Sequence, residues 1–223
     1  MNKFITYGIF LIIYFSLSKS LSPNEYGIEY IQNNQRLSES IQGSPVSVLL
    51  VDIHTTGFLI KTYYHKYKII YGFQSYEELI IRTSRQFTEK SLPYIGMSVM
   101  RRGNSSNEVN FTPLPPGSIF IGNKSFGSWK KKGTTTKVWK FFRVYRQIPK
   151  YLGWEDFTPT LKFHKELLKR EKQSLPFIGS NDEFGLGGSI TQIAFPKYFK
   201  RQKPNSVDFN LLLQKYINEN YIK

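Results

Sequence analysis

The residues best suited to bind another molecule lie where cations and aromatic rings alternate. From Lys124 to Trp154 the chain has nine Lys and Arg residues and no acidic residue. On a hairpin, such cations can hold a row of phosphates or carboxylates while the rings stack on bases or sugars. The cations also repel one another, and this repulsion opposes folding unless an anion binds nearby. The pattern therefore predicts an anion-binding surface.

Two basic runs supply the expected ligand contacts. For the rings an alternative stays open, because an ordinary amphipathic hairpin turns its rings to the core and only its charges to water. The candidate ligand-binding residues are Trp129, Lys130, Lys131, Lys132, Lys137, Trp139, Lys140, Arg143 and Arg146 in the first run, and Lys197, Lys200 and Arg201 in the second.

Carboxylates and histidines suggest a second, enzymatic interpretation. Glu155 follows a tryptophan, and an aromatic environment can raise the pKa of a carboxyl group until it serves as a general acid. Asp182 and Glu183 form another acid pair. His54 lies on the same side of a predicted strand as Asp52, because side chains in a strand repeat every two residues. The candidate catalytic residues are Glu155, Asp182, Glu183 and His54. The alternative for the Asp52–His54 pair is a structural hydrogen bond.

A glycine-rich stretch offers a third candidate. Glycines supply positive φ angles, and Ser189 behind them is expected to cap a short helix. The free N–H groups at such a helix start can also bind an anion, so Gly187, Gly188 and Ser189 are candidate anion-binding residues. No nucleotide-binding loop and no zinc-protease or serine-hydrolase motif is present. We therefore expect no cofactor and no metal.

The sequence GGSITQ, Gly187 to Gln192, resembles the Gly-Gly-Ser-Thr-Ile-Thr-Gln-Gln motif of the peptidoglycan glycosyltransferases in penicillin-binding proteins. That family also carries Glu-Asp-x-x-Phe upstream, and here EDF runs from Glu155 to Phe157. The resemblance implies that Glu155 is catalytic and that Ser189 and Thr191 hold a lipid-linked sugar phosphate. The chain departs from both motifs, because one Thr and the two-residue gap before the Phe are missing. The chain is therefore not assigned to that family.

The amino-terminal residues are typical of an export signal. Lys3 is followed by an almost wholly apolar run from Ile5 to Leu17 and then by small serines. We expect residues 1–22 to be a signal peptide or, as the alternative, an uncleaved membrane anchor. The absence of Cys excludes disulfides and thiolate chemistry. A secreted or periplasmic protein is the expectation.

The net charge of +15 is unevenly distributed. Residues 23–110 carry 9 cations and 8 acids, whereas residues 111–223 carry 20 cations and 8 acids. Such a surface attracts polyanions. The expected partners are cell-wall glycans or lipid phosphate surfaces, with nucleic acid less favoured.

The elements that must position these residues indicate an α+β fold. The run VSVLLV from Val46 predicts a strand buried on both faces, and the S-x-x-E pattern at Ser75 predicts a helix from Tyr76 to Lys90. A hairpin with KKKGTT at its tip is expected across the basic run. Thr158 is expected to cap one helix, and a carboxyl-terminal helix is expected to dock through Phe209 and its apolar neighbours.

Together these elements predict a mostly antiparallel sheet with about four helices. We expect one compact domain over residues 23–223, with a possible internal joint near 104–117. The favoured function is an exported, envelope-associated protein that binds an anionic polymer or a phosphate-bearing membrane surface. The alternatives are an enzyme acting on cell-wall glycan through Glu155 or the Asp182–Glu183 pair, and a purely partner-binding envelope protein.

Overall fold

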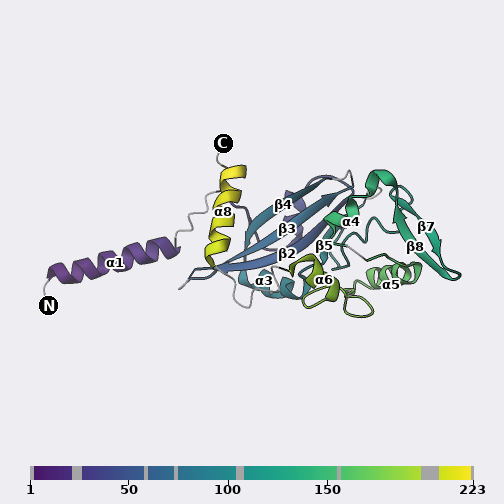
Figure 1. Ribbon diagram of the computed structural model, residues 1–223. Coiled ribbons are helices and arrows are strands. Elements are labelled where there is room, and N and C mark those ends of the chain that lie inside the picture. Colours follow the sequence, from purple (N-terminus) through teal and green to yellow (C-terminus); the bar gives the residue numbers. More distant parts are fainter. Residues whose placement is uncertain are drawn as a thin grey trace.

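The computed structural model shows an α+β fold, as expected (Figure 1). Its described residues form seven α-helices, more than the four expected, and two short 3-10 helices. The candidate residues Glu155, Lys197, Lys200 and Arg201 lie outside the described residues. The structure describes residues 3–21, 27–57, 60–72, 75–103, 108–154, 157–196 and 206–221.

A curled six-stranded sheet forms the centre of the molecule (Figure 1). The strand order is β1-β4-β3-β2-β5-β6, and every pairing is antiparallel except that of β1 with β4. The prediction of a mostly antiparallel sheet is therefore confirmed. The strands are β1 (Tyr30–Ile31), β2 (Val46–Thr56), β3 (Thr62–Tyr71), β4 (Tyr76–Thr83), β5 (Ser98–Arg102) and β6 (Val109–Asn110).

The central strands β2 and β3 carry apolar side chains on both faces of the sheet. The first five residues of β2 are all buried, which confirms the prediction from VSVLLV. In β3, Tyr67 and Ile69 pack into the core under one face, whereas Tyr64 and Ile70 pack into two separate cores on the other. Both faces must therefore be covered by other parts of the chain.

Short helices cover the first face. They are α2 (Asn34–Ser40), α3 (Arg85–Ser91) and the 3-10 helix η1 (Leu92–Tyr94). The side chain of Asn33 accepts a hydrogen bond from the N–H of Arg36, and that of Ser84 accepts one from the N–H of Phe87. These caps satisfy backbone donors that a helix start otherwise leaves unpaired. Leu37 and Phe87 then pack against the sheet.

The carboxyl-terminal helix α8 (Ser206–Asn220) covers one end of the second face (Figure 1). Phe209 and Leu213 are buried against Tyr64 and Ile80 of the sheet. The predicted docking helix is therefore confirmed. It buries two large apolar side chains, each of which contributes roughly 1.5–3 kcal/mol.

The other end of that face is covered by an aromatic-rich region, which carries the basic hairpin (Figure 1). Its core contains Ile70 of the sheet together with phenylalanine, tryptophan and leucine side chains from the hairpin, α4, α5 and the segments between them. The elements are β7 (Gly127–Lys132), β8 (Thr136–Phe141), the 3-10 helix η2 (Arg143–Tyr145), α4 (Ile148–Tyr151), α5 (Leu161–Lys172) and α6 (Ser189–Ala194).

The predicted helix from Tyr76 to Lys90 is wrong in its first half. Residues 76–83 form strand β4, which pairs with β3 over its whole length. Glu78, the expected partner in a capping box, instead forms an ion pair with Lys66 of β3 at 2.7 Å. The helix begins only at Arg85, because Ser84 rather than Ser75 caps it.

The start of α5 also differs from the prediction. The helix expected behind Thr158 begins at Leu161 and is capped by Thr160, whose hydroxyl accepts from the N–H of Phe163.

The predicted signal segment contains α1 (Lys3–Leu21), whose apolar side chains from Phe4 to Phe15 are largely exposed. Within the described part of the chain, no helix has both the length and the apolar character needed to cross a membrane.

The buried histidine of β3 makes stability depend on pH. His65 contacts the Tyr67 hydroxyl at 2.8 Å and the Thr88 hydroxyl at 3.1 Å, and burial lowers its pKa from 6.5 to about 3. The unfolded chain therefore binds this proton first as the pH falls. We expect the wild type to lose up to about 1.4 kcal/mol of unfolding free energy per pH unit between pH 6.5 and about 3.

The variant His65→Gln retains a hydrogen-bonding side chain and removes this titration. Urea unfolding across that pH range should give a visibly flatter curve for the variant than for the wild type. Equal slopes for the two proteins would contradict the assignment, because all other titrating groups are shared.

Candidate anion-binding surface

The basic stretch forms the expected hairpin, with KKKGTT at its tip. β7 and β8 pair in a register that sets Trp129 opposite Trp139 and Lys131 opposite Lys137. The ring centroids of the two tryptophans lie 5.2 Å apart, edge to face. Because paired residues share a face, the tryptophans and these two lysines lie on the same side of the hairpin.

The hairpin rings belong to the core and are not held out for stacking. Trp139 is only 2% exposed, and Trp129 packs against that core and against His164 of α5 at 5.5 Å between ring centroids. The expectation that these tryptophans stack on a base or sugar is therefore wrong for Trp139, which has no free ring face to offer. The alternative of rings turned inward describes the hairpin.

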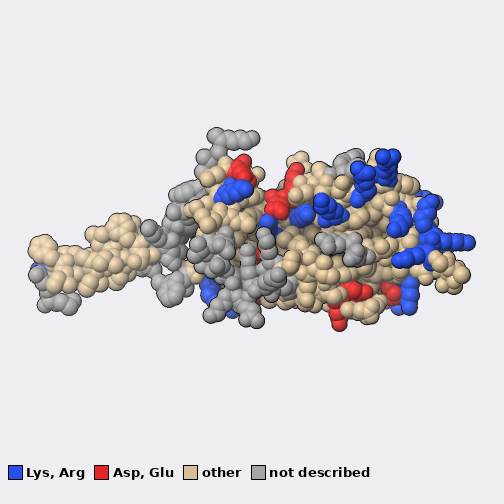
Figure 2. Space-filling model, viewed as in Figure 1, with Lys and Arg blue, Asp and Glu red and all other residues tan. Residues whose placement is uncertain are grey.

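The cations of the hairpin, by contrast, all face solvent. Figure 2 shows Lys and Arg side chains gathered over the end of the molecule that carries β7 and β8. In the described part of the chain, none of these side chains forms an ion pair with an acidic one. The exposed cations are Lys130, Lys131, Lys132, Lys137, Lys140, Arg143 and Arg146.

A groove runs between the hairpin tip and the start of α5. It encloses about 580 Å³ and contains three lysine side chains and no acidic one. Lys162 and Lys165 lie one turn apart on the same face of α5, so both reach the groove opposite Lys137. The lining residues are Thr135, Thr136, Lys137, Thr160, Leu161, Lys162 and Lys165.

Backbone contacts hold the two walls of this groove together. The N–H of Trp139 donates to the carbonyl of Pro159 at 2.8 Å, and Val138 forms a bridge with Thr160. The first turn of α5 is thus fixed beside β8, with the positive end of its dipole at the groove. Three ammonium groups, threonine hydroxyls and a helix start can together bind phosphate, sulfate or carboxylate groups.

The far end of α5 is anchored to the sheet through a buried arginine. Arg101 of β5 donates to the carbonyls of Ser98 and Thr112 at 3.2 and 2.7 Å, to the side-chain oxygen of Asn110 at 2.8 Å, and to Glu171 of α5 at 3.4 Å. Burial lowers the pKa of Arg101 to about 10, against the opposing effect of Glu171. The carboxylate of Glu171 is thereby engaged away from the lysines of the groove.

Of the candidate catalytic residues, His54 and the Asp182–Glu183 pair lie on different elements, and Glu155 lies outside the described residues. His54 contacts Asp52 at 2.9 Å, as expected from their spacing, and stacks on Phe209 of α8 with ring centroids 4.0 Å apart. Glu183 instead accepts a hydrogen bond from the N–H of Asn181 in the glycine-rich turn. The contacts of His54 are thus those of a residue that holds α8 to the sheet.

The glycine-rich turn has no free donors for an anion at the start of α6. The N–H of Ser189 donates to the carbonyl of Asp182 at 3.2 Å, and the next two N–H groups donate to the carbonyl of Glu183 at 2.9 and 3.3 Å. The helix cap is Gly188, not Ser189 as expected, and it contributes no side-chain hydrogen bond. The anion-binding use of Gly187, Gly188 and Ser189 therefore finds no support in the geometry.

The GGSITQ sequence serves packing within this region. Thr191 is buried, and a Cβ atom at Gly96 would collide with it. The side-chain amide of Gln192 donates to the carbonyl of Gly187 at 2.9 Å and closes the turn. Thr191, which the glycosyltransferase resemblance assigns to substrate, instead lies in the interior.

Comparisons with protein-family models, with curated proteins and with solved structures find no match for this chain. Among the described residues, no group of three or more His, Asp or Glu side chains is placed to hold a metal ion.

Sequence reasoning missed the α5 wall of the groove. Lys162 and Lys165 lie outside the basic stretch and are followed by Glu166, so their local sequence resembles an ordinary solvated helix. Their spacing of three residues puts them on one face of a helix, which is the only local signal available. That this face meets the hairpin follows from tertiary packing.

The paired lysines of the hairpin should destabilise the free protein. Like charges directly opposite in a sheet are unfavourable, so Lys137→Thr should raise the unfolding free energy at low salt by a few tenths of a kcal/mol. The gain should shrink in high salt, where the repulsion is screened. Denaturant unfolding at low and high NaCl measures both effects.

The matched control is Lys140→Thr, because Lys140 is also exposed on β8 but lies opposite Ser128. This variant makes the same change in β-propensity without removing an opposed pair. An equal, salt-independent gain in both variants would contradict the repulsion between Lys131 and Lys137.

Proposed function

We propose that the protein is an exported, envelope-associated protein that binds an anionic polymer or a phosphate-bearing membrane surface. The observation that carries this proposal is the set of exposed hairpin cations that have no acidic partner in the described part of the chain. They continue into a groove whose opposite wall adds Lys162 and Lys165.

Unpaired cations in such number favour a polyanionic partner. Two charges about 10 Å apart in water repel by roughly 0.4 kcal/mol, and many pairs contribute across a hairpin of this size. A polyanion converts this repulsion into attraction and releases its own counterions. The folded protein therefore gains most from a ligand that carries several anionic groups.

The distribution of the cations favours an extended ligand over a small one. Lys131 and Lys137 lie on the face that continues from the tryptophans, whereas Lys130 and Lys140 lie on the opposite face. One small anion cannot contact both sets. A polymer that wraps the hairpin, or a charged surface into which the tip inserts, can contact both.

The envelope location is part of the proposal and rests on the amino-terminal sequence. A short apolar run behind a single lysine, followed by serines, is the layout of an export signal. Residues 1–22 would then be removed or retained as an anchor, and residues 23–223 would form the binding domain. The enzymatic alternative has less support, because His54 pairs with Asp52 and stacks on Phe209, whereas Glu183 is bound within the glycine-rich turn.

The experiment compares two triple variants that remove the same charge. Lys130, Lys131 and Lys132, each changed to Gln, remove three unpaired cations from the hairpin. Binding to vesicles containing phosphatidylglycerol should fall by roughly a hundredfold at low salt, at about 1 kcal/mol per cation. With polyphosphate or DNA as the probe, the slope of log affinity against log salt should fall by roughly three.

The control changes Arg36, Arg85 and Lys215 to Gln. These exposed cations already pair with Glu39, Glu89 and Glu219, so the net charge falls equally but no unpaired cation is lost. Equal losses in the two triple variants would show attraction to net charge alone and would sink the hairpin site. The relative affinities for vesicles, polyphosphate and DNA separate a membrane from a soluble polymer.

A further inference from the structure

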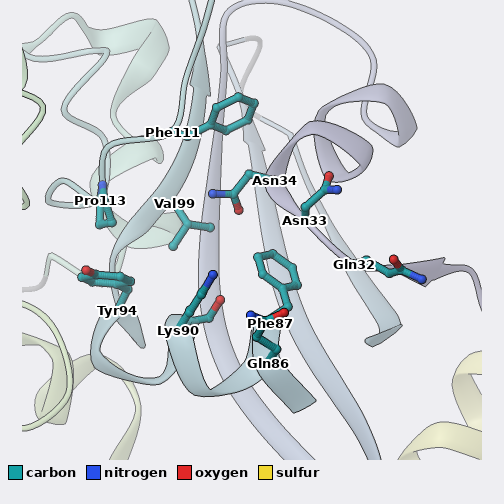
Figure 3. Close-up of a pocket in the computed structure, with 11 residues that line it drawn as sticks. Gln32, Asn33, Asn34, Gln86, Phe87, Lys90, Tyr94, Val99, Phe111 and Pro113 are labelled. Carbon is teal, nitrogen blue, oxygen red and sulfur yellow. The ribbon is translucent and has the colours of Figure 1, made fainter. Parts of the chain in front are cut away.

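A second hollow lies on the face of the sheet that α2 and α3 cover. Figure 3 shows it between α2, α3 with η1, strand β5 and the segment that carries Phe111 and Pro113. It encloses about 500 Å³, the volume of a pocket for a small organic ligand. No residue of β7, β8 or α5 lines it, so it is separate from the basic groove.

Carboxamide side chains are among the residues that line this hollow. Gln32, Asn34 and Gln86 contribute amide groups for which no hydrogen bond to another described residue is found, whereas Asn33 is already used to cap α2. Figure 3 shows the Asn34 amide directed into the space between the helices and the sheet. Each carboxamide offers two donors and an acceptor, which is the combination that sugar hydroxyl and acetamido groups can satisfy.

Aromatic rings form part of the wall and floor. Tyr94 and Phe111 are half-buried, and the ring of Phe87 is buried and packs against His65 at 5.3 Å between ring centroids. Rings of this kind supply a flat apolar surface with little rotamer entropy to lose on binding. A pyranose presents an apolar C–H face and a polar rim, so rings and carboxamides in one hollow suit it.

The hollow contains one charged group. Lys90 extends toward its middle in Figure 3, no acidic side chain lines the space, and in the described part of the chain Lys90 has no ion pair. A single ammonium among neutral amides matches a ligand with a single negative charge. This distinguishes the hollow from the basic groove, where three lysines face one another.

We propose that this hollow binds a sugar ring that carries one carboxylate. The ring lies against Tyr94 and Phe111, its hydroxyl and acetamido groups bond to the carboxamides of Asn34 and Gln86, and its carboxylate pairs with Lys90. The site does not depend on the basic hairpin.

The test uses two disaccharides that differ in one group. The neutral probe is the N-acetylglucosamine dimer, and the acidic probe is N-acetylglucosamine linked to N-acetylmuramic acid, which adds one lactyl carboxylate. Amide NMR titration should place the shifts at α2, α3 and Phe111, with the acidic probe bound about three- to tenfold more tightly. Lys90→Gln should make the two affinities equal without abolishing binding.

Matched variants separate the site from the fold. Gln86→Ala should weaken binding of both probes about fivefold, whereas Gln214→Ala, an exposed helical glutamine on α8, should leave it unchanged. Tyr94→Ala should weaken both probes, and Tyr94→Phe should largely restore them. The hairpin triple variant should bind both probes as the wild type does, so failure here and failure of the anion surface are distinguishable.

Three results would overturn the proposal. The first is no shift with either probe in a protein whose unfolding is normal. The second is binding that is unchanged in both Gln86→Ala and Tyr94→Ala. The third is a preference for the acidic probe that survives Lys90→Gln.

Discussion

The buried guanidinium of Arg101 constrains the position of α5 and, through it, the basic groove. A cation that is only 3% exposed costs several kcal/mol unless its N–H groups all find acceptors. Its acceptors come from its own strand, from the segment at Asn110 and Thr112, and from Glu171 of α5. Satisfying this one group therefore fastens α5 to the sheet, and the other end of α5 becomes the wall opposite the hairpin.

Among the described residues, no acidic side chain lines the groove. Glu171 is one of only two acidic residues on α5, and it is engaged with Arg101 at the far end of the helix. The aromatic rings of the hairpin pack in the core that joins it to Ile70 of the sheet, whereas its lysines are exposed. Lys131 and Lys137 lie on the same face as the tryptophans but nearer the tip, where they are exposed, and Lys130 and Lys140 lie on the opposite face.

Local patterns predicted the parts of the structure that local physics controls. The buried run from Val46, the hairpin tip and the docking of Phe209 follow from alternation, turn residues and helical spacing. The capping pattern at Ser75 failed because pairing with β3 outweighed a weak helical signal over the same residues. The cap expected at Ser189 failed because Gly188 permits a close approach to the carbonyl of Glu183. The position of Lys162 and Lys165 opposite the hairpin could not be predicted from local sequence patterns, because it depends on how α5 packs against the hairpin.

The most direct test of the central claim is NMR of the protein with its lysines reductively methylated with carbon-13, which preserves their charge. Polyphosphate is added at constant ionic strength while the lysine methyl resonances are followed. The resonances of Lys131, Lys137, Lys162 and Lys165 should shift first and together, while those of Lys66 and Lys215, which pair with carboxylates, stay in place. Uniform shifts of all lysines, or shifts confined to residues outside the hairpin and α5, would contradict the claim.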